Sequence, residues 1–577
     1  MILSRVPPKQ FIKRHGQLNR HFGSVRFQNS KKLTSNGYQF KLIASIAGSF
    51  TLGSIIGFIL SRQWNSHSSK LQRFPLGSTT PLNQLDSPQY GSSQDLEKCI
   101  REIGQAIGEA KIVSTAAAIN YHTENGFNIG KPLPEQRPRS VVYVESTEDV
   151  SQLMKLATKY RIPVVPFSGG TCLEGSTYST RECIIVNTSR MNQVVQVFPD
   201  DLDAIVQAGV GWQQLNEYLS REPGLENLML GCDCGPGAHI CGMINTNASG
   251  IGATRYGSMG ANIISVKAVL PDGTIIKTKR RPRKTSAGYN LTGLLVGSEG
   301  TLAIVTEATV KLQVRQPYET VAVVQFPTLS DSVQAVSDLF KKGFQFNAVE
   351  MLDAKTMECV NKSNQISRTY ANVPTLFFRI AGLNKTVVNE YVKELRKIAK
   401  LNNCTKIEAA RSAEEAKELF AARKNVLYMM LNYGFNEVHE EAKMWITDFA
   451  VPISKMASTL ESVSRLLDSH SLHYMALGHV GDGNFHCDIF YRPDQYQLVK
   501  RVVQQMNKIT LDHEGTCSGE HGVGLSKRDF LQDELGEDTI EFMRKIKISV
   551  DPLRILNPDK MIRIDPRDPV DEYLKNF

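Results

Sequence analysis

Acidic residues are absent from the start of this chain: the first is Asp86, whereas basic residues recur from Arg5 to Lys41. The formal net charge of +9 is therefore misleading as a guide to binding partners, because the basic excess is concentrated in this leader. An acid-free leader rich in Arg, Lys, Ser, Asn and Gln is typical of a mitochondrial presequence rather than of a nucleic-acid-binding patch. We predict a presequence at residues 1–41 and no nucleic-acid partner, with a disordered basic tail as the alternative.

The ten cysteines are scattered, and only Cys232 and Cys234 are close to one another in the sequence. One residue between two cysteines is poor spacing for a structural zinc knuckle, and no disulfide framework follows from the other positions. A Gly-x-Gly-x-x-Gly sequence opening an early βαβ unit is also missing, which argues against an ordinary nicotinamide site of the Rossmann type. Any dinucleotide cofactor would have to be bound in another way.

Residues 42–60 contain no charged residue and are bracketed by Lys41 and Arg62. As a helix rising about 1.5 Å per residue, this stretch nearly spans a bilayer core of about 30 Å. We therefore predict a single transmembrane anchor at 42–60, arrested in the mitochondrial inner membrane with the bulk of the chain in the intermembrane space. A longer cleaved leader and an enzyme that faces the matrix are the alternative.

At 577 residues the chain is too long for one hydrophobic core, so more than one folded domain is expected. The Ser-, Gln-, Pro- and Asn-rich segment 61–94 is typical of a flexible tether. The pattern that follows predicts a helical segment at 95–137 and then a block of short β-rich runs and glycine loops that begins at 138.

Glycine-rich loops dominate the block that begins at 138, chiefly at residues 167–175, 235–238, 242–250 and 255–260. Backbone amides freed by adjacent glycines can point together at an anion, so the loop at 167–175 is a phosphate cradle in principle. Surface turns share this composition, and one such loop alone is weak support. Several of them between β-rich segments indicate a domain that wraps an extended ligand with a pyrophosphate.

Two histidines, His479 and His486, flank the Gly-Asp-Gly sequence at 481–483, and apolar stretches on both sides predict a β-hairpin. A hairpin brings the two imidazoles together. With Glu520 as a third ligand, they have the composition of a catalytic zinc site or another divalent site that keeps a coordination position open. His521, beside that carboxylate, is then free to act as a base. A histidine pair alone is more often packing than ligation.

The glycine-rich stretches at 166–175, 243–260 with 271–274, and 288–302 resemble the vanillyl-alcohol oxidase or p-cresol methylhydroxylase (PCMH) type of FAD-binding family. Within it, the segments at 478–486, 519–522 and 555–558 resemble the D-2-hydroxyacid dehydrogenases, most nearly the mitochondrial D-lactate dehydrogenases that reduce cytochrome c. The resemblance covers roughly residues 138–564.

The resemblance implies an α+β fold: a PCMH-type FAD-binding domain of two subdomains at 138–315 plus a cap domain with an antiparallel sheet at 316–540. It also implies that the chain returns to the FAD-binding domain at 541–577. It implies FAD, held non-covalently because Ser168 stands where covalent members of the family offer a histidine. It also implies a divalent metal at His479, His486 and Glu520, with Zn²⁺ the first candidate and Mn²⁺ the alternative. The residues expected to bind FAD are Pro166, Ser168, Gly169, Gly170, Thr171, Cys172, Leu173, Gly175, Pro236, Gly237, Gly242, Asn245, Thr246, Ala248, Gly250, Tyr256, Gly257, Ile304 and Asn557.

For catalysis, the resemblance implies that His521 removes the hydroxyl proton of a D-2-hydroxy acid while the flavin takes the hydride. Arg423 stands where the family clamps the substrate carboxylate, although an exposed helical arginine is the plainer interpretation of that position. Lys443 is a candidate second cation. Asp488, on the same alternating face as His486, would either orient a ligand or face water.

The expected reaction is the oxidation of D-lactate to pyruvate with cytochrome c as electron acceptor. A D-2-hydroxyglutarate dehydrogenase is the close alternative, which would need an extra cation for the distal carboxylate. Two further alternatives stay open. One is a lactone oxidase or alkyl-glycerone synthase type of flavoprotein, which would not need His479, His486 and Glu520. The other is a membrane-tethered binding protein without chemistry.

Overall fold

The computed structural model describes residues 77–123, 132–568 and 570. The expected presequence, the expected anchor and most of the expected tether lie outside these residues. Among the helices that the structure describes, none combines the length and the apolar character needed to cross a bilayer.

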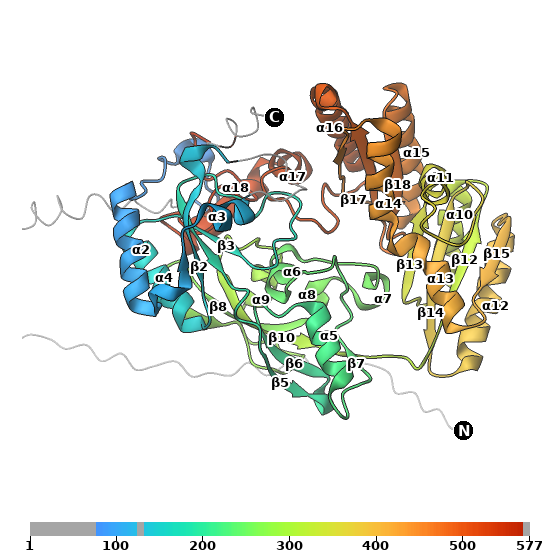
Figure 1. The fold of residues 1–577 in the computed structure, drawn as a ribbon, viewed down its shortest axis with the longest axis horizontal. Helices are drawn as coiled ribbons and strands as arrows, with labels where there is room; N and C mark the ends of the chain where they lie inside the picture. Colours follow the sequence, from blue (N-terminus) through green and yellow to red (C-terminus); the bar gives the residue numbers. More distant parts are fainter. Residues whose placement is uncertain (1–76, 124–131, 569, 571–577) are drawn as a thin grey trace, which may run out of the picture. The chain divides into compact units, whose positions relative to one another are not determined.

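The first subdomain is built on a four-stranded sheet in the order β1-β2-β4-β3, in which β2, β4 and β3 run parallel. Both faces of its strands are covered, since alternate residues such as Val141 and Val142 enter different hydrophobic clusters. Helices α2 and α4 cover one face (Figure 1). The elements are α2 (Ser93–Ile107), β1 (Ile112–Val113), α3 (Ala116–Thr123), β2 (Pro138–Tyr143), α4 (Thr147–Tyr160), β3 (Val164–Phe167) and β4 (Cys183–Asn187).

The segment expected to be helical at 95–137 is only partly so. Helix α2 ends at Gly108, whose φ of 107° lies where glycine is favoured over other residues. The chain then forms the short strand β1, which pairs with β2. The amphipathic pattern therefore predicted the first helix but not the strand, because a two-residue strand leaves too little periodicity to detect.

The second subdomain is a five-stranded antiparallel sheet in the order β5-β6-β10-β8-β9. Its core is formed by one face of the sheet with α5, α6 and α8. A two-stranded pair, β7 with β11, lies beside it. The elements are β5 (Val194–Phe198), β6 (Asp203–Gln207), α5 (Trp212–Arg221), β7 (Leu228–Met229), α6 (Ile240–Thr246), α7 (Ala253–Tyr256), α8 (Met259–Asn262), β8 (Ile263–Val269), β9 (Ile275–Lys277), α9 (Leu291–Leu295), β10 (Ile304–Lys311) and β11 (Gln313–Val314).

The cap domain contains an antiparallel sheet in the order β15-β12-β14-β13-β18-β19-β16, with β17 paired to β19 (yellow to orange in Figure 1). Its strands are β12 (Tyr318–Gln325), β13 (Ala348–Leu352), β14 (Thr375–Gly382), β15 (Lys406–Ala409), β16 (Lys443–Trp445), β17 (Phe449–Ala450), β18 (His473–Gly478) and β19 (Asn484–Tyr491). Its helices are α10 (Leu329–Lys341), α11 (Ala354–Lys362), α12 (Lys385–Leu401), α13 (Ala413–Lys424), α14 (Val426–Tyr433), α15 (Ile453–Ser469) and α16 (Tyr496–Asp512).

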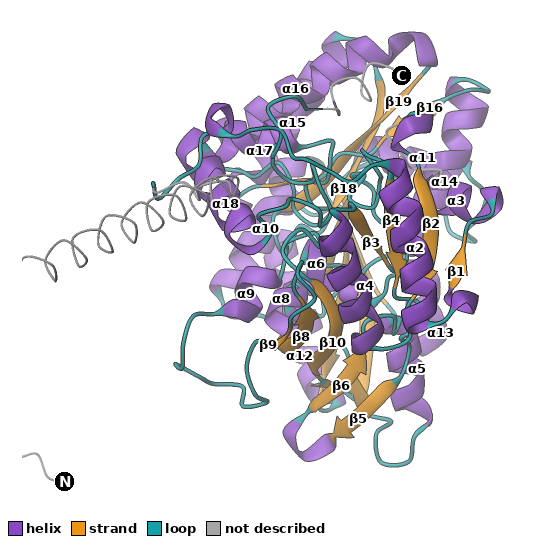
Figure 2. Ribbon diagram, turned by 90° about the vertical axis from the view of Figure 1, so that its left-hand side faces the viewer, coloured by secondary structure: helices purple, strands orange, loops and turns teal. Residues whose placement is uncertain are grey.

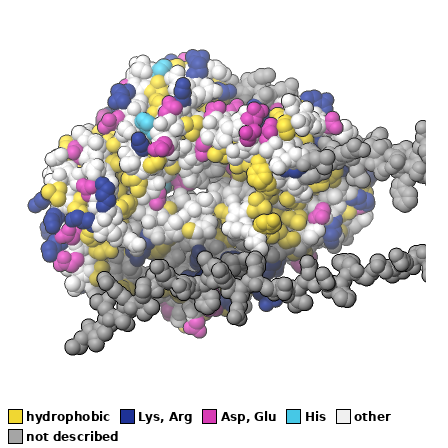
Figure 3. Space-filling model, turned by 180° about the vertical axis from the view of Figure 1, so that it is seen from behind, with side chains coloured by type: hydrophobic (Ala, Val, Ile, Leu, Met, Phe, Trp, Pro, Cys, Tyr) yellow, Lys and Arg dark blue, Asp and Glu magenta, His cyan; other side chains and the backbone are white. Residues whose placement is uncertain are grey.

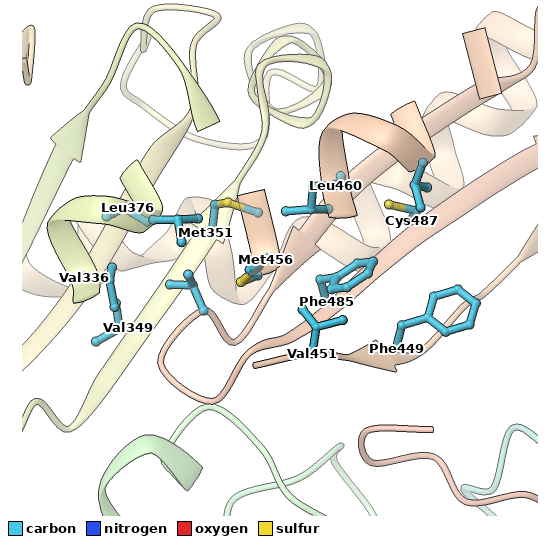
Figure 4. Packing of buried hydrophobic residues seen from close by; sticks show 14 of the residues in the cluster. Val336, Val349, Met351, Leu376, Phe449, Val451, Met456, Leu460, Phe485 and Cys487 are labelled. Atoms are coloured by element: carbon cyan, nitrogen blue, oxygen red, sulfur yellow. The ribbon is translucent and has the colours of Figure 1, made fainter. Parts of the chain in front are cut away.

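Helices cover both faces of the cap sheet, because alternate strand residues are apolar on both sides. Helices α10, α12, α15 and α16 pack on one face, and α11, α13 and α14 pack on the other. Figure 4 shows part of the first core, where side chains from α10, β13, β14, α15 and β19 come together around Met456. The second face is the one that carries α13 and α14 to the functional site.

The chain returns to the first domain before residue 541, where the return was expected. The backbone N–H of Leu525 donates to Glu174 O, and that of Met561 donates to Gly524 O. Gly524 permits this approach, since a Cβ there would lie 1.9 Å from Glu174 O. Helices α17 (Arg528–Leu535) and α18 (Glu537–Val550) follow. The segment that carries Glu520 and His521 is therefore the crossing between the two domains.

Candidate active site

A cavity of about 1210 Å³ lies between the glycine-rich loops of the first domain and the cap. This exceeds the roughly 300–1,000 Å³ common for small-molecule sites. One wall consists of loop residues 166–173 together with parts of 233–251, and the opposite wall consists of residues from α13, α14 and the β18-β19 hairpin. The cavity has room for an extended cofactor and a small substrate together.

The β18-β19 hairpin forms as the sequence predicts, with residue 477 opposite 486. Gly483 in the turn has a φ of 77°, and a Cβ there would lie 2.1 Å from Val451 O, so the turn requires glycine. The rings of His479 and His486 come to 6.0 Å between centroids. Both side chains are buried, and both line the cavity.

The Nδ1 atom of each histidine, on the side of the ring away from Glu520, faces a hydrogen-bond acceptor. His479 Nδ1 lies 2.8 Å from Glu350 Oε1, and His486 Nδ1 lies 2.8 Å from Thr447 O. Each Nδ1 therefore carries a proton, which leaves the lone pair of the neutral ring on Nε2. Both Nε2 atoms face Glu520 Oε1, at 3.3 and 3.4 Å.

The two Nε2 atoms and Glu520 Oε1 all carry lone pairs, and such atoms repel one another at this distance unless a proton or a cation lies between them. Burial alone would lower the pKa of His479, but the charges of Glu350 and Glu520 outweigh burial and raise this pKa well above its usual value. Burial likewise acts to raise the pKa of Glu520, and the charge of His479 overcomes it and lowers this pKa. Two imidazoles with oriented outer nitrogens plus one carboxylate fit a divalent cation.

Asp448 holds the crossing segment in place. Its Oδ2 accepts from the backbone N–H groups of Glu520 and His521, both at 2.9 Å, and from Ser518 Oγ at 2.9 Å. Lys527 Nζ also lies 3.4 Å from this oxygen. Asp448, His486 and His521 are close enough to form a second ligand set. Because Asp448 Oδ2 already serves these donors, the set of His479, His486 and Glu520 fits a cation better.

His521 lies beside the predicted metal ligands and stacks on His486, with ring centroids 5.2 Å apart. Its Nδ1 lies 3.7 Å from Glu174 Oε1 and 3.9 Å from Asp448 Oδ2, too far for hydrogen bonds. Burial acts to lower the pKa of His521, but the charge of Asp448 and the nearby Glu174 raise it above its usual value. The ring therefore lines the cavity with an unengaged Nδ1 among the described atoms.

Arg423 on α13 is only 8% exposed, so the interpretation as an exposed helical arginine is wrong. It lines the cavity, as a carboxylate clamp should. However, its Nε and Nη2 bind Glu350 Oε2 at 2.8 and 2.7 Å. Glu350 in turn holds His479. The Nε and Nη2 groups of Arg423 are therefore already bound to Glu350, which orients His479. They are not available for a two-point contact with the substrate carboxylate.

Lys443 is not brought to the cavity. It begins β16 opposite Tyr491, is exposed, and is not among the residues that line the cavity. Because β16 is the last strand in the order of the sheet, Lys443 lies at its edge and faces solvent.

Asp488 is buried rather than water-facing and accepts from the backbone N–H of Thr447 at 3.2 Å. Burial raises the pKa of Asp488 to about 6.

Most residues expected to bind FAD line one cavity wall. These are Pro166, Ser168, Gly169, Gly170, Thr171, Cys172, Leu173, Pro236, Gly242, Asn245, Thr246, Ala248, Gly250, Ile304 and Asn557. Gly175, Gly237, Tyr256 and Gly257 do not line it. Gly237 lies just behind the wall, because a Cβ on Gly169 would lie 2.6 Å from its carbonyl oxygen.

The cavity wall carries polar atoms that suit a flavin dinucleotide. Asn245 Oδ1 and Asn557 Oδ1 are buried acceptors without a partner among the described atoms. The Asn557 amide nitrogen is fixed by the carbonyl oxygens of Ser176 and Glu299, at 3.1 and 2.7 Å. Unpaired buried acceptors are costly unless a ligand brings donors to them. Nothing lies within 4 Å of the place that a Cβ on Gly242 would take, so the backbone at this residue is open to such a ligand.

Several residues of the site were assigned no role from the sequence: Glu174, His239, Glu299, Glu350, Arg379, Asp448 and Lys527. Glu350 lies 129 positions from His479 and carries no local motif. Glu299 falls within the glycine-rich stretch at 288–302, and its carboxylate accepts from the backbone N–H groups of Val523 and Gly524 at 2.6 and 2.8 Å. A positive φ of 50° at this non-glycine residue marks a specialised position.

Comparison with known proteins assigns the family. Residues 138–279 match the FAD binding domain, and residues 315–561 match the C-terminal domain of FAD linked oxidases. The mitochondrial D-lactate dehydrogenase (cytochrome) of Kluyveromyces lactis is 43% identical over 91% of this chain and 91% of its own length. The chain belongs to this family of FAD-linked oxidoreductases. The resemblance inferred from the sequence is thereby confirmed.

More distant members extend the picture. The mitochondrial D-2-hydroxyglutarate dehydrogenase of Danio rerio is 28% identical, over 72% of this chain and 77% of its own. The solved structure of p-cresol methylhydroxylase with substrate bound has a TM-score of 0.69 at 16% identity, covering 83% of this chain and 99% of that one. The latter shows the fold alone, and confirms the expected PCMH-type architecture. Membership of the family supports FAD as the cofactor.

Proposed function

We propose that this oxidoreductase converts D-lactate to pyruvate with FAD and a divalent metal, and passes the electrons to cytochrome c. The observation that carries the proposal is the meeting, in one cavity, of a glycine-rich cofactor wall with the set of His479, His486 and Glu520. The names of two relatives, the mitochondrial D-lactate dehydrogenases (cytochrome) of Kluyveromyces lactis and of Saccharomyces cerevisiae, support D-lactate as substrate and a cytochrome as acceptor; the second is 42% identical over 94% of this chain and 94% of its own length.

His479, His486 and Glu520 would hold the metal, with Zn²⁺ the first candidate and Mn²⁺ the alternative. A divalent ion there supplies Lewis acidity toward the substrate hydroxyl and carboxylate. Glu350 and Thr447 keep both imidazole rings turned with Nε2 inward. Asp448 keeps Glu520 at the same point by holding its backbone N–H. These residues thus preset the ligand geometry before substrate binds.

The loop at 166–173, the segment 242–250 and Asn557 would hold FAD. The flavin supplies the acceptor for the hydride that leaves the substrate carbon. Non-covalent attachment follows from Ser168 in the phosphate loop. Its Oγ lies 3.0 Å from His239 Nδ1 and engages that ring in a hydrogen bond.

His521 would take the hydroxyl proton as the hydride leaves. Its ring lines the cavity next to the ligands that would orient the hydroxyl. Glu174 and Asp448 stabilise the imidazolium that forms, and Lys527, 3.0 Å from Glu174 Oε1, limits this effect. Arg423 would attract the substrate carboxylate with Nη1, which has no hydrogen bond to the described residues, while its other edge supports Glu350.

The second candidate substrate is D-2-hydroxyglutarate, and Arg379 is the observation that favours it. Arg379 on β14 lines the cavity and offers the extra cation that a distal carboxylate needs. Its Nε is bound to Glu319 Oε1 at 2.8 Å, which offsets much of its charge. D-lactate therefore remains the first proposal.

A mitochondrial location is part of the proposal, since the relatives in two yeasts carry mitochondrial names. The acid-free leader and the uncharged stretch at 42–60 support a presequence and an inner-membrane anchor. An intermembrane-space position of the catalytic part fits cytochrome c as acceptor.

The deciding experiment is anaerobic addition of D-lactate, L-lactate or D-2-hydroxyglutarate to the purified flavoprotein while the flavin absorbance is followed. D-lactate should bleach the flavin, and L-lactate should not. His521→Ala should keep flavin and metal but lose bleaching, and His486→Ala should lose metal first. Turnover that survives metal removal, or normal turnover in either variant, would contradict the assigned roles.

A further inference from the structure

A long loop at residues 278–290 joins β9 to α9 without helix or strand, and it stands away from the rest of its domain (Figure 2). Loops of this length without secondary structure are uncommon inside a folded domain and are usually functional or disordered. This one is fixed to the body. Arg281 pairs with Asp201 and Asp203, and Arg283 donates to the carbonyl oxygens of residues 201 and 202 at 3.0 and 2.9 Å.

The loop carries charge of one sign only. Six bases fall between 277 and 284, and no acidic residue occurs between Asp272 and Glu299. Elsewhere, charges of both signs are interspersed over the surface shown in Figure 3. With Arg281 and Arg283 engaged, three bases of the loop remain without a counter-ion among the described residues: Lys279, Arg280 and Lys284.

The neighbourhood of the loop has a positive field. Burial lowers the pKa of Lys311, and the charges of Arg283 and Lys279 lower it further. Lys311 Nζ is bound to the backbone carbonyl oxygen of Ala261 and not to a carboxylate. Lys311 therefore adds to the positive charge of Lys279, Arg280 and Lys284 without a carboxylate partner among the described residues, and an anionic partner would stabilise these charges.

Apolar side chains are exposed at the end of the same loop. Tyr289 is 93% exposed, and Leu291 and Leu294, one turn apart on α9, are 38% and 39% exposed. Tyrosine and leucine beside lysine and arginine are the residues that enter the interfacial region of a bilayer, where the bases meet lipid headgroups. A nucleic acid or a purely acidic protein face would leave this apolar part uncovered.

We propose that the loop at 278–290, together with the exposed side of α9, binds an anionic lipid surface. Lys279, Arg280 and Lys284 would contact the headgroups, and Tyr289, Leu291 and Leu294 would enter the interface. A second copy of this chain would bring the same positive charge against it, which disfavours self-association here. The inference stands apart from the proposed oxidation and from the expected N-terminal anchor, since it uses only residues of the second subdomain.

The test places a reporter in the loop of the full chain. Tyr289→Trp protein is mixed with vesicles of phosphatidylcholine alone or with added cardiolipin, each containing brominated lipid. The fluorescence of the native tryptophans is measured on the otherwise identical chain that keeps Tyr289 and is subtracted. The remaining fluorescence, from the introduced tryptophan, should be quenched only by the anionic vesicles. Adding Lys279→Gln, Arg280→Gln and Lys284→Gln should weaken association of the loop by roughly 100-fold, since each base contributes about 1 kcal/mol at an anionic surface.

A matched control removes three bases elsewhere. Lys393→Gln, Arg396→Gln and Lys397→Gln on α12 change the net charge equally on another exposed surface, and should leave the quenching intact. Vesicle co-sedimentation reports the N-terminal anchor separately. Equal quenching in both vesicle types, no quenching in either, or equal loss in both triple variants would overturn the proposal. So would a tryptophan shift that follows protein concentration without lipid, which would indicate a second copy.

Discussion

Replacement of Glu350 by glutamine tests how the metal ligands are supported. Glu350 is fully buried and divides its two oxygens between partners: Oε1 faces His479 Nδ1 at 2.8 Å, and Oε2 faces the Arg423 guanidinium at 2.7 and 2.8 Å. Glutamine has the same shape but only one acceptor. If its oxygen faces His479, its amide group meets the donors of Arg423. If the amide faces His479, Nδ1 loses its acceptor and the proton is free to move to Nε2.

Either orientation weakens the cation site. Loss of an outer partner of a ligating histidine typically costs about 10–100-fold in metal affinity, or roughly 1.4–2.8 kcal/mol. Breaking the buried pair with Arg423 adds a cost in stability of about 3–5 kcal/mol. We expect the Glu350→Gln variant to bind FAD but to have about 10–100-fold lower affinity for Zn²⁺. Competition with a calibrated chelator measures the affinity, and the flavin spectrum monitors the cofactor.

The chain offers a matched control. Glu319 on β12, separated from β13 by β14 in the sheet, also pairs with an arginine that lines the cavity, Arg379, at 2.8 Å, but has no histidine partner among the described residues. Glu319→Gln should leave the Zn²⁺ affinity unchanged. The reasoning is refuted if Glu350→Gln retains the affinity of the unaltered protein, or if both variants lose it to the same extent.

Three further outcomes follow from the packing and charges. Gly169→Ala should cost about 1–3 kcal/mol in FAD affinity, measured by flavin fluorescence, because its Cβ would meet Gly237 O at 2.6 Å. Burial raises the pKa of Glu299 to about 7, above the value of about 4.5 expected in the unfolded chain. Protonated Glu299 therefore contributes to the stability of the fold fully below about pH 4.5, and this contribution is lost as the pH rises through about 7. Glu299→Gln should flatten the pH dependence of Tm over this range. Leu460→Ala in the fully buried core of the cap should destabilise by about 2–5 kcal/mol without altering the flavin spectrum, as judged by urea unfolding beside the bound-flavin absorbance.

Features encoded by neighbouring residues were predicted from the sequence. The hairpin around residues 481–483 follows from a glycine turn between two apolar stretches, and the loops that line one wall of the cavity follow from closely spaced glycines. Such patterns act over a few residues and leave a local trace. The helical expectation for 95–137 failed where Gly108 ended a helix and a two-residue strand joined the sheet instead.

By itself, the sequence determined which residues are chemically able to bind a cation and a dinucleotide, because His479, His486, Glu520 and the glycine loops lie in recognisable local patterns. Only the tertiary structure decided what orients them. Glu350 and Asp448 reach the site through contacts between segments far apart in the sequence, and no spacing along the chain predicts such contacts. The same long-range pairing placed Arg423 against a carboxylate and turned Lys443 to solvent, since strand register and burial, rather than residue type, determine where a cation points.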